Sequence, residues 1–505
     1  MDQLGRRLTG AALVLPASVL LIVSYVEPTI WTVRRSFSRL DIFRRSAGGA
    51  SQGGVTTENY AEIVDAGLFD DIVFALSLTV VPAVGLFLVG PLIAWTTARA
   101  GRPARLVVRG LLALPLAAWA PTAYAVSWRA EVDGVAGAST ARAALWVTSF
   151  AALTALGATI FLATRRLRPA LVAGTVVALA LVAGALQSFT FPYLLNGRTP
   201  VTTMFDRAFR FFDFNGAAAI ASLLLVALSG LGLVAVVLLV ATGLRIRWER
   251  PAGGDQAAWA GPVALVLAGG AVVVGALAVS TWLGRLGADG PPGSGRILVN
   301  TLLPPLLSAL VAVGVAALAA VGIGVLRPFG RHSEWLLLIF APWLFVGTDI
   351  LALRAAASGD TALRSGSFVD LMPPTWLAIP ALVLLTLLVG GLTDRYRELR
   401  ELSVPAGAAV RRGYLWPGLP AVALAVGVVW LGHVHDLFWP VVTSGGQVPT
   451  AQSALLSLIQ DFQRLDAAIA VVSPPLLLVL TAATAIVAQV TYLDRVTVDA
   501  GTMSR

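Results

Sequence analysis

The chain has 505 residues, of which 57% are hydrophobic and only 12% are charged, and its mean hydropathy is +0.83. Soluble domains carry about 25% charged residues, so this composition excludes an ordinary soluble domain and predicts that most of the chain lies in lipid. The net charge of +9 does not indicate nucleic-acid binding, because the arginines that produce it lie mainly between the hydrophobic runs.

Apolar runs of about 20 residues, the length that crosses a membrane, recur along the whole chain. The first follows Arg6 and Arg7 and resembles a signal peptide, but the run is long and no small-x-small cleavage site follows it. We interpret it as a retained first helix. The expected spans number about a dozen, and they are 9–33, 72–98, 106–128, 142–164, 170–189, 216–244, 259–284, 298–326, 334–355, 374–393, 414–433 and 467–491.

The loops between these spans differ in their arginine content. The positive-inside rule assigns arginine-rich loops to the cytoplasm, and with the N-terminus inside, the cytoplasmic loops hold most of the arginines. The sequence therefore predicts a multi-pass protein of the cell (inner) membrane, in contact with membrane lipid and with both termini in the cytoplasm. The cytoplasmic arginines would be Arg99, Arg102, Arg105, Arg165, Arg166, Arg168, Arg245, Arg247, Arg250, Arg327, Arg331, Arg395, Arg397, Arg400, Arg411 and Arg412.

Similar motifs recur in the same order in the two parts of the chain. The stretch 191–200, which ends in proline, is followed by 211–219, and the stretch 438–449, which also ends in proline, is followed by 461–468. This order indicates an internal repeat.

Each repeat contains an even number of expected spans, so the repeats would be parallel and related by an axis along the membrane normal. We expect two transmembrane halves, 1–250 and 251–505, which meet at a polar linker near residues 250–256.

The stretch from Glu401 to Pro420 carries the most specific signal. It lies in an expected cytoplasmic loop, with Gly407 six residues after Glu401 and a Leu-Pro pair at its end. A short helix, a turn that glycine permits and a second helix would form a knob for a cleft on another protein. The alternative is an ordinary basic loop with a chance glycine and proline. The residues assigned to this site are Arg400, Glu401, Gly407, Arg411, Arg412, Leu419 and Pro420.

This spacing resembles the loop with which permeases of ABC importers contact their ATPase, which begins Glu-Ala-Ala, has a glycine six residues after the glutamate and ends Leu-Pro. Further short motifs resemble the carbohydrate-uptake family of these permeases, the maltose and glycerol-phosphate type. The first half resembles one subunit of a heterodimeric pair and the second half resembles the other. The motifs include Asn59-Tyr60, 193–197, 213–219, Asn300-Thr301 and 436–440.

The resemblance implies an all-α polytopic membrane fold with about 12 transmembrane helices in two parallel six-helix repeats, the type I ABC importer fold. It also implies a permease for sugar-like solutes that works by alternating access. The partners would be ABC ATPase subunits on the cytoplasmic side and an extracytoplasmic solute-binding protein.

The sequence departs from the family pattern in two places. Leu402, Ser403 and Ala406 replace the usual Ala, Ala and Asp of the ATPase-contact loop. In the first half only 165–169 are available for the corresponding loop, whereas a helix-turn-helix knob needs roughly 20 residues. We therefore expect an asymmetric permease with one recognisable ATPase contact.

Residues of the expected outer loops are candidates for the solute pathway. Their aromatic rings can stack on sugars, form an interfacial belt or pack against a binding protein. His433 and His435 lie beside Asp436, but a metal site needs three or more converging ligands, so we expect a polar cap there and no metal. The candidates are Phe191, Tyr193, Asn196, Asp436, Phe438 and Trp439.

The chain is not expected to be an enzyme or to hold a cofactor. It has no lysine and hence no Walker-type loop, and no cysteine and hence no thiolate chemistry. Any ATP hydrolysis would be performed by a partner.

Two other functions remain open. The pair Asp70-Asp71 resembles the acids of lipid-linked membrane glycosyltransferases, although acids also stabilise the start of a helix. The short first-half loop also fits a degenerate scaffold that kept the fold and lost transport. The sequence does not identify a solute.

Overall fold

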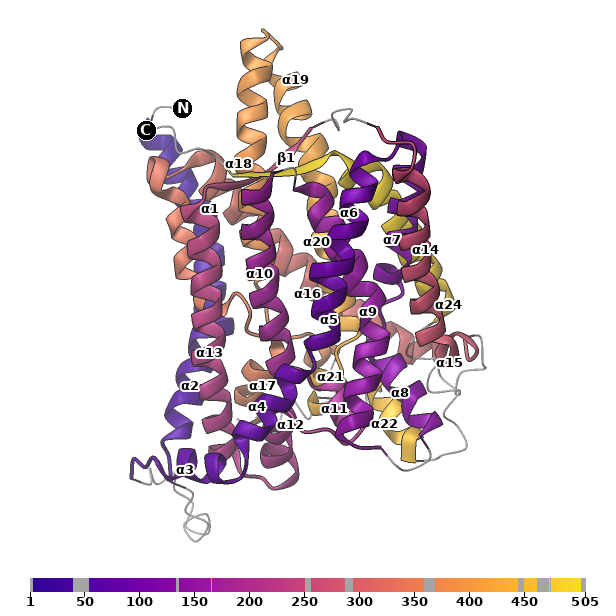
Figure 1. Cartoon of the computed structure of the whole chain (residues 1–505). Coiled ribbons are helices and arrows are strands. Elements are labelled where there is room, and N and C mark those ends of the chain that lie inside the picture. Colours follow the sequence, from indigo (N-terminus) through magenta and orange to yellow (C-terminus); the bar gives the residue numbers. More distant parts are fainter. Residues whose placement is uncertain are drawn as a thin grey trace.

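A computed structural model of the chain describes residues 3–39, 54–132, 136–164, 166–249, 256–286, 294–357, 368–443, 449–460, 472 and 474–500. Within this described part, ten helices are long and apolar enough to cross a membrane, and a bent pair of helices forms an eleventh span if it is counted as one. The chain is therefore an all-α, multi-pass membrane protein, as its composition predicts (Figure 1).

The spans before residue 250 are formed by α1 (Gln3–Leu21) with α2 (Glu27–Ser36), α4 (Leu68–Ser77) with α5 (Val80–Val84) and α6 (Gly90–Arg99), the bent pair α7 (Arg102–Ala117) and α8 (Pro121–Glu131), α9 (Ala138–Ala163), α10 (Leu167–Leu186) with α11 (Thr190–Leu194), and α13 (Phe214–Ala241). The later spans are formed by α14 (Ala260–Ala278), α16 (Ser294–Val321), α18 (Ile379–Glu401), α19 (Ala406–Val410) with α20 (Trp416–Val434), and α24 (Pro475–Val487). The shorter elements are α3 (Glu58–Asp65), α12 (Pro200–Phe205), α15 (Ser280–Leu283), α17 (Thr348–Ala357), α21 (Phe438–Thr443), α22 (Ala451–Gln460), β1 (Leu244–Trp248) and β2 (Val496–Ala500).

The expected span 106–128 is broken in the middle. α7 and α8 meet at an angle of 67°. Proline disfavours the helical conformation in the residue before it, and Ala120, which precedes Pro121, has φ −137° and ψ 70°. The hydroxyl of Thr481 in α24 donates to the Ala117 carbonyl at 3.3 Å, which satisfies one of the acceptors that the break frees.

The prediction of one continuous span over 334–355 is wrong. This part of the chain forms 3₁₀ turns at Gly330–Ile339 and Ala341–Trp343, followed by α17. Pro342 lacks an N–H and cannot continue the hydrogen-bond ladder of a helix. The side chain of Gln187 satisfies the freed backbone, because it accepts from the Gly347 N–H at 2.6 Å and donates to the Phe345 carbonyl at 2.7 Å.

Two features inferred from the sequence lie outside the described residues. They are the linker 250–256, apart from its last residue, and the motif 461–468.

Helices from the two parts of the chain exchange places. α1 packs against α16, and the backbones approach so closely that a Cβ on Gly322 would lie 2.8 Å from the Gly10 carbonyl oxygen. In the reverse direction, α14 packs against α6, α7 and α9, and a Cβ on Gly275 would lie 2.6 Å from the Ala151 methyl. Each part therefore holds the first helix of the other.

The last span of each part makes a second pair of reciprocal contacts. α13 packs against the 3₁₀ turn 341–343, where no Cβ would fit between Gly232 and the Ala341 carbonyl. α24 packs against α7, in the bent pair of helices. The last span of each part thus covers an interrupted segment of the other part.

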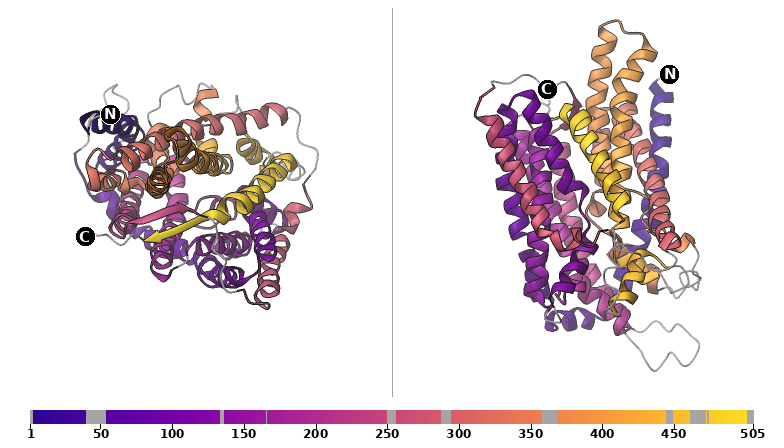
Figure 2. Two further views of the ribbon diagram at one scale, coloured as in Figure 1. Left: turned by 90° about the horizontal axis from the view of Figure 1, so that it is seen from above. Right: turned by 90° about the vertical axis from the view of Figure 1, so that its right-hand side faces the viewer.

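The strands β1 and β2 form an antiparallel pair that runs from Leu244 opposite Ala500 to Trp248 opposite Val496. β1 follows α13 and packs on α18, whereas β2 follows the last span and touches α9 and α10. Seen from above in Figure 2, the pair crosses the end of the bundle at which both termini lie. The sheet therefore links helices of the two parts at that end.

Candidate functional site

The stretch assigned to ATPase contact forms the tip of a helical hairpin. α18 continues to Glu401, the chain turns through 402–405, and α19 and α20 lead back into the bundle. The hairpin projects beyond the other helices at the end with both termini, which we call the hairpin end (Figure 1). Leu402 at the tip is 76% exposed, so the hairpin offers an accessible surface.

Gly407 does not form the turn, and the expected helix–glycine turn–helix knob is wrong in this respect. Gly407 lies in α19, and the residue with a left-handed backbone is Ser403, with φ +61°. The Ser403 N–H bonds the Arg400 carbonyl at 3.0 Å and the Val404 N–H bonds the Leu399 carbonyl at 3.1 Å. This pattern closes the end of α18 as a helix C-cap does. The turn is therefore tighter than the glycine spacing predicts.

The other residues assigned to this site lie along the hairpin. Arg400 donates to the Val404 carbonyl at 2.8 Å and braces the turn. Arg411 and Arg412 are exposed in the π-helical turn Arg411–Leu415. Leu419 and Pro420 lie inside α20 and are exposed, rather than at the end of a loop.

An ion-pair network anchors the foot of the hairpin. Arg245 of β1 pairs with Glu334 and with Asp394 of α18, each at 3.4 Å. Arg327 also pairs with Glu334 at 3.4 Å, and burial, together with the positive charge of Arg245, lowers the pKa of Arg327. These ion pairs would therefore transmit a movement of the hairpin to β1 and to the segment that follows α16.

Among the described residues of the first part, no equivalent hairpin connects α9 and α10. α9 ends at Ala163 and α10 begins at Leu167, so only residues 164–166 connect them. Thr164 forms an isolated bridge with Val498 of β2. The connection that corresponds to a second ATPase-contact loop is therefore only three residues long, and its first residue pairs with β2.

Aromatic residues gather at the opposite end of the bundle, which we call the loop end. Phe438 packs against Phe189, Phe205 and Phe209, with ring centroids 5.0, 5.7 and 6.3 Å apart. Tyr193 stacks on Phe189 at 4.7 Å. The structure thus brings together candidate residues from 189–209 and from 438, which are far apart in sequence.

These rings do not form an exposed interfacial belt. Phe191, Phe438 and Trp439 are all less than 5% exposed. Asn196 is exposed and has φ +56°, at the turn before α12. Phe438 and Trp439 therefore do not contribute to an interfacial belt, because Phe438 packs against rings of the first part of the chain and Trp439 is buried.

Asp436 precedes α21 and is half-buried, and its Oδ2 atom is fully buried. Its Oδ1 accepts the Phe438 N–H at 3.0 Å, while its Oδ2 has no hydrogen-bond partner in the described part of the chain. Burial raises the pKa of Asp436 to about 6 and lowers the pKa of His435 to about 4. Asp349 of α17 lies close enough to Asp436 for the two carboxyl groups to interact.

Buried polar atoms are normally hydrogen-bonded, and three more in this region lack a partner among the described residues: His435 Nδ1, Trp439 Nε1 and Gln452 Oε1. No group of three potential metal ligands occurs in the described part. The sequence did not point to Asp349 or Gln452, because only the fold brings Asp349 near Asp436 and Gln452 to the Val434 carbonyl.

The two residues of the acidic pair Asp70-Asp71 lie in different environments. Asp71 is buried, lies 3.5 Å from the Arg198 guanidinium and accepts from the Thr203 hydroxyl at 2.5 Å. Asp70 is exposed in the first turn of α4. Asp71 thus joins α4 to the turn before α12, which is a structural role.

Comparison with protein-family models, with curated protein sequences and with solved structures finds no match to this chain. The described residues define a polytopic α-helical membrane protein with one bent pair of helices, α7 and α8, and a projecting hairpin formed by α18, α19 and α20.

Proposed function

We propose that the chain is the membrane permease of an importer for sugar-like solutes. Its halves, 1–250 and 251–505, would be two parallel six-helix repeats of the type I ABC importer kind. The observation that carries this proposal is the reciprocal packing, in which α1 crosses to α16 while α14 crosses to α6, α7 and α9. Repeats that interlock around an axis normal to the membrane can rock against each other around a central path.

The broken spans support the same proposal. Irregular backbone within a membrane is tolerated where it is buried in protein or lines a cavity. The interruption at 118–120 packs against α24 and the one at 340–347 packs against α13, so each would lie between the two parts, beside the path of a solute. Backbone carbonyls and the side chain of Gln187 are the polar groups present there.

A separate ATPase on the hairpin end would supply the energy. The hairpin tip combines an exposed leucine with exposed arginines and a glutamate, and the network of Arg245, Glu334 and Asp394 would pass its motion to β1. With one hairpin, coupling is asymmetric. A solute-binding protein would deliver the solute at the loop end, with the N- and C-termini in the cytoplasm of a cell that holds the chain in its inner membrane.

The first experiment is copurification with the ATPase subunit encoded nearest to this chain, combined with uptake of labelled sugars by a deletion strain. The double variant Glu401→Arg/Gly407→Trp is expected to lose both the ATPase and uptake. Phe329→Ser changes a side chain that is 65% exposed in another turn, and it is expected to keep both. Absence of any ATPase from the purified native chain, together with unchanged uptake in the deletion strain, would reject the permease proposal.

The second candidate is a scaffold that does not transport. The three-residue connection between α9 and α10 and the sheet that links the two parts favour it. It predicts that the deletion strain takes up every tested solute normally while a partner membrane protein is lost. The glycosyltransferase alternative finds less support, because Asp71 is held by Arg198 and Thr203.

A further inference from the structure

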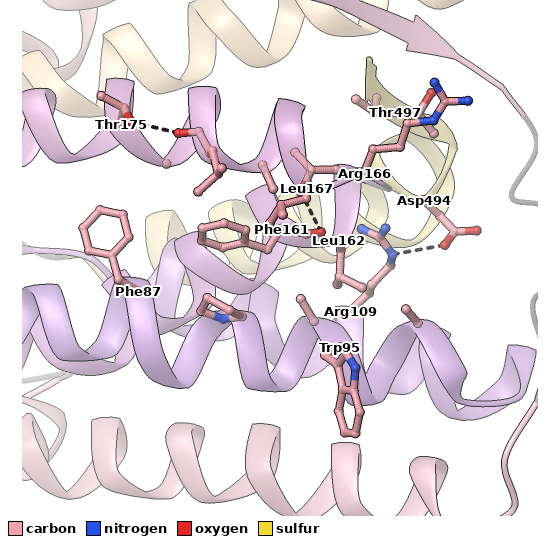
Figure 3. Close-up of a pocket in the computed structure, with 18 of the residues that line it drawn as sticks. Phe87, Trp95, Arg109, Phe161, Leu162, Arg166, Leu167, Thr175, Asp494 and Thr497 are labelled. Carbon is pink, nitrogen blue, oxygen red and sulfur yellow. Dashed lines mark hydrogen bonds and ion pairs between the residues drawn. The ribbon is translucent and has the colours of Figure 1, made fainter. Parts of the chain in front are cut away.

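A groove of about 1070 Å³ runs along the surface of the bundle between α6, α9 and α10. Apolar side chains such as Phe87 and Phe161 line one end, whereas Arg109, Arg166 and Asp494 lie together at the other (Figure 3). The groove is open, since Leu171 on its wall is 61% exposed. Its walls are therefore apolar along most of their length and charged at the hairpin end.

The length of the groove matches one leaflet of a bilayer. Its lining runs from Phe87 to Ala98 on one side and from Leu167 to Ala178 on the other. Eleven helical steps on each side span roughly 16 Å at 1.5 Å per residue. Half of a hydrocarbon core of about 30 Å is about 15 Å. An acyl chain lying in the groove would thus reach from the membrane surface to its midplane.

The charged end holds more positive than negative charge. Arg105 and Arg109 lie one helical turn apart on α7, so both reach the same place, and their Nε atoms lie 3.2 and 3.1 Å from one oxygen of Asp494. Both guanidinium groups are largely buried, with side chains 18% and 4% exposed. A single carboxylate therefore offsets only one of two buried cations, which is unfavourable without a further anion.

A third arginine stands at the mouth of the groove. The Arg166 side chain is 76% exposed, and its nearest carboxylate is that of Asp499, at 3.9 Å. It can turn toward a phosphate group at the membrane surface, where each basic residue strengthens the attraction of an anionic lipid.

A glycine keeps the apolar part open. A Cβ on Gly174 would lie 3.6 Å from Phe161 Cζ and 4.0 Å from Phe87 Cε1, at ordinary contact distance. Any longer side chain at this position would fill the groove without disturbing the helix packing behind it.

We propose that this groove binds an anionic phospholipid from the leaflet next to the hairpin end. One acyl chain lies between α6 and α10, and the phosphate lies against Arg105, Arg109 and Arg166. The proposal does not depend on transport activity, because it rests on the groove alone.

The test titrates the purified full-length chain in detergent with dioleoylphosphatidylglycerol or dioleoylphosphatidylcholine and counts bound lipid by native mass spectrometry. The native chain is expected to bind phosphatidylglycerol more tightly. Arg166→Gln should weaken phosphatidylglycerol binding roughly fivefold and leave phosphatidylcholine binding unchanged. Gly174→Leu should weaken binding of both lipids, because it blocks the acyl chain, and should not lower the melting temperature.

Arg412→Gln is the matched control, since Arg412 is an exposed arginine at the same end but outside the groove. It should bind both lipids like the native chain, and excess inorganic phosphate should not displace bound lipid. Equal affinity of the native chain for the two lipids, equal loss in the Arg412 variant, or displacement by phosphate alone would each overturn the proposal.

Discussion

Gly391 of α18 lies directly against the carbonyl oxygen of Ile246 in β1, with no room for a Cβ between them. Arg395, one helical turn further along α18, donates to the Trp248 carbonyl at 2.6 Å and stacks over the Trp248 ring at 4.7 Å. The strand that links the two parts of the chain is thus held to the foot of the hairpin by backbone contact, a hydrogen bond and a cation–π contact.

Gly391→Ala is expected to lower the free energy of unfolding by about 1–3 kcal/mol, because overpacking must push β1 away from α18. Thermal unfolding in detergent measures the change. Gly427→Ala is the matched control, since Gly427 is also in a helix and has nothing within 4 Å of its would-be Cβ. The control should be neutral or slightly stabilised, and equal losses in both variants would contradict the contact.

The sequence predicted where the long spans lie, but it did not predict which backbones meet closely, as the difference between Gly391 and Gly427 shows. The apolar runs predicted the long spans because lipid requires about 20 apolar residues whatever their neighbours are. The prediction failed at 334–355 because hydropathy does not indicate whether a helix is continuous. There the side chain of Gln187, which is distant in sequence, forms the hydrogen bonds that the interrupted backbone lacks.

The site was predicted less well than the spans. Glu401 and Arg400 do lie at an exposed tip, but the turn depends on Ser403, whose left-handed backbone the glycine spacing did not indicate. The aromatic candidates of the two parts lie together in space, and Phe438 is buried among rings from the other part. Burial depends on which helices pack together, and this is not encoded in a local motif.

Gln187→Leu is expected to destabilise the protein by about 1–3 kcal/mol. The substitution removes the acceptor for the Gly347 N–H and the donor to the Phe345 carbonyl, and leaves half-buried backbone groups unpaired. Thr175→Val is the control, because the Thr175 hydroxyl bonds only its own helix, at the Leu171 carbonyl, and is exposed. A Gln187 variant as stable as the control would show that these bonds do not hold the broken span.

Asp436→Asn is expected to stabilise the protein at neutral pH but not in acid. The pKa of Asp436 is raised to about 6 by burial, above the ordinary value of about 3.9. The folded state then binds the proton more tightly, so this carboxyl's contribution to stability falls as pH rises from about 4 to about 6. Asparagine cannot ionise and so avoids this loss in the free energy of unfolding, which amounts to at most about 3 kcal/mol. Chemical denaturation of the native chain and the variant at pH 4 and pH 7 measures the difference.

The neighbouring histidine supplies an internal control of opposite sign. Burial lowers the pKa of His435 to about 4, below the ordinary value of about 6.5, so stability due to the neutral ring is lost as pH falls between these values. His435→Gln should therefore lose less stability in acid than the native chain. If neither variant changes the pH dependence, the two groups are not buried as described.

A disulfide between β1 and β2 is expected to stop transport if the chain is a permease. Arg247 and Thr497 lie opposite each other in the sheet. Cα atoms of such paired residues are about 4.5–5.5 Å apart, within the range of about 4.4–6.8 Å that a disulfide can join. The chain has no cysteine, so Arg247→Cys/Thr497→Cys gives a clean cross-link between the two parts. Alternating access requires the two halves to separate at the hairpin end, and a covalent link there would prevent this separation.

Uptake by cells of the deletion strain that carry the double variant measures the effect. Oxidation should abolish uptake and a reducing agent should restore it, whereas either single cysteine variant should respond to neither. Full uptake with the disulfide formed would mean that the sheet stays closed during transport and that the solute path opens elsewhere. In that case β1 and β2 would stay paired throughout the transport cycle. The motion of the hairpin would then have to be transmitted to the solute path through α18 and α20 alone.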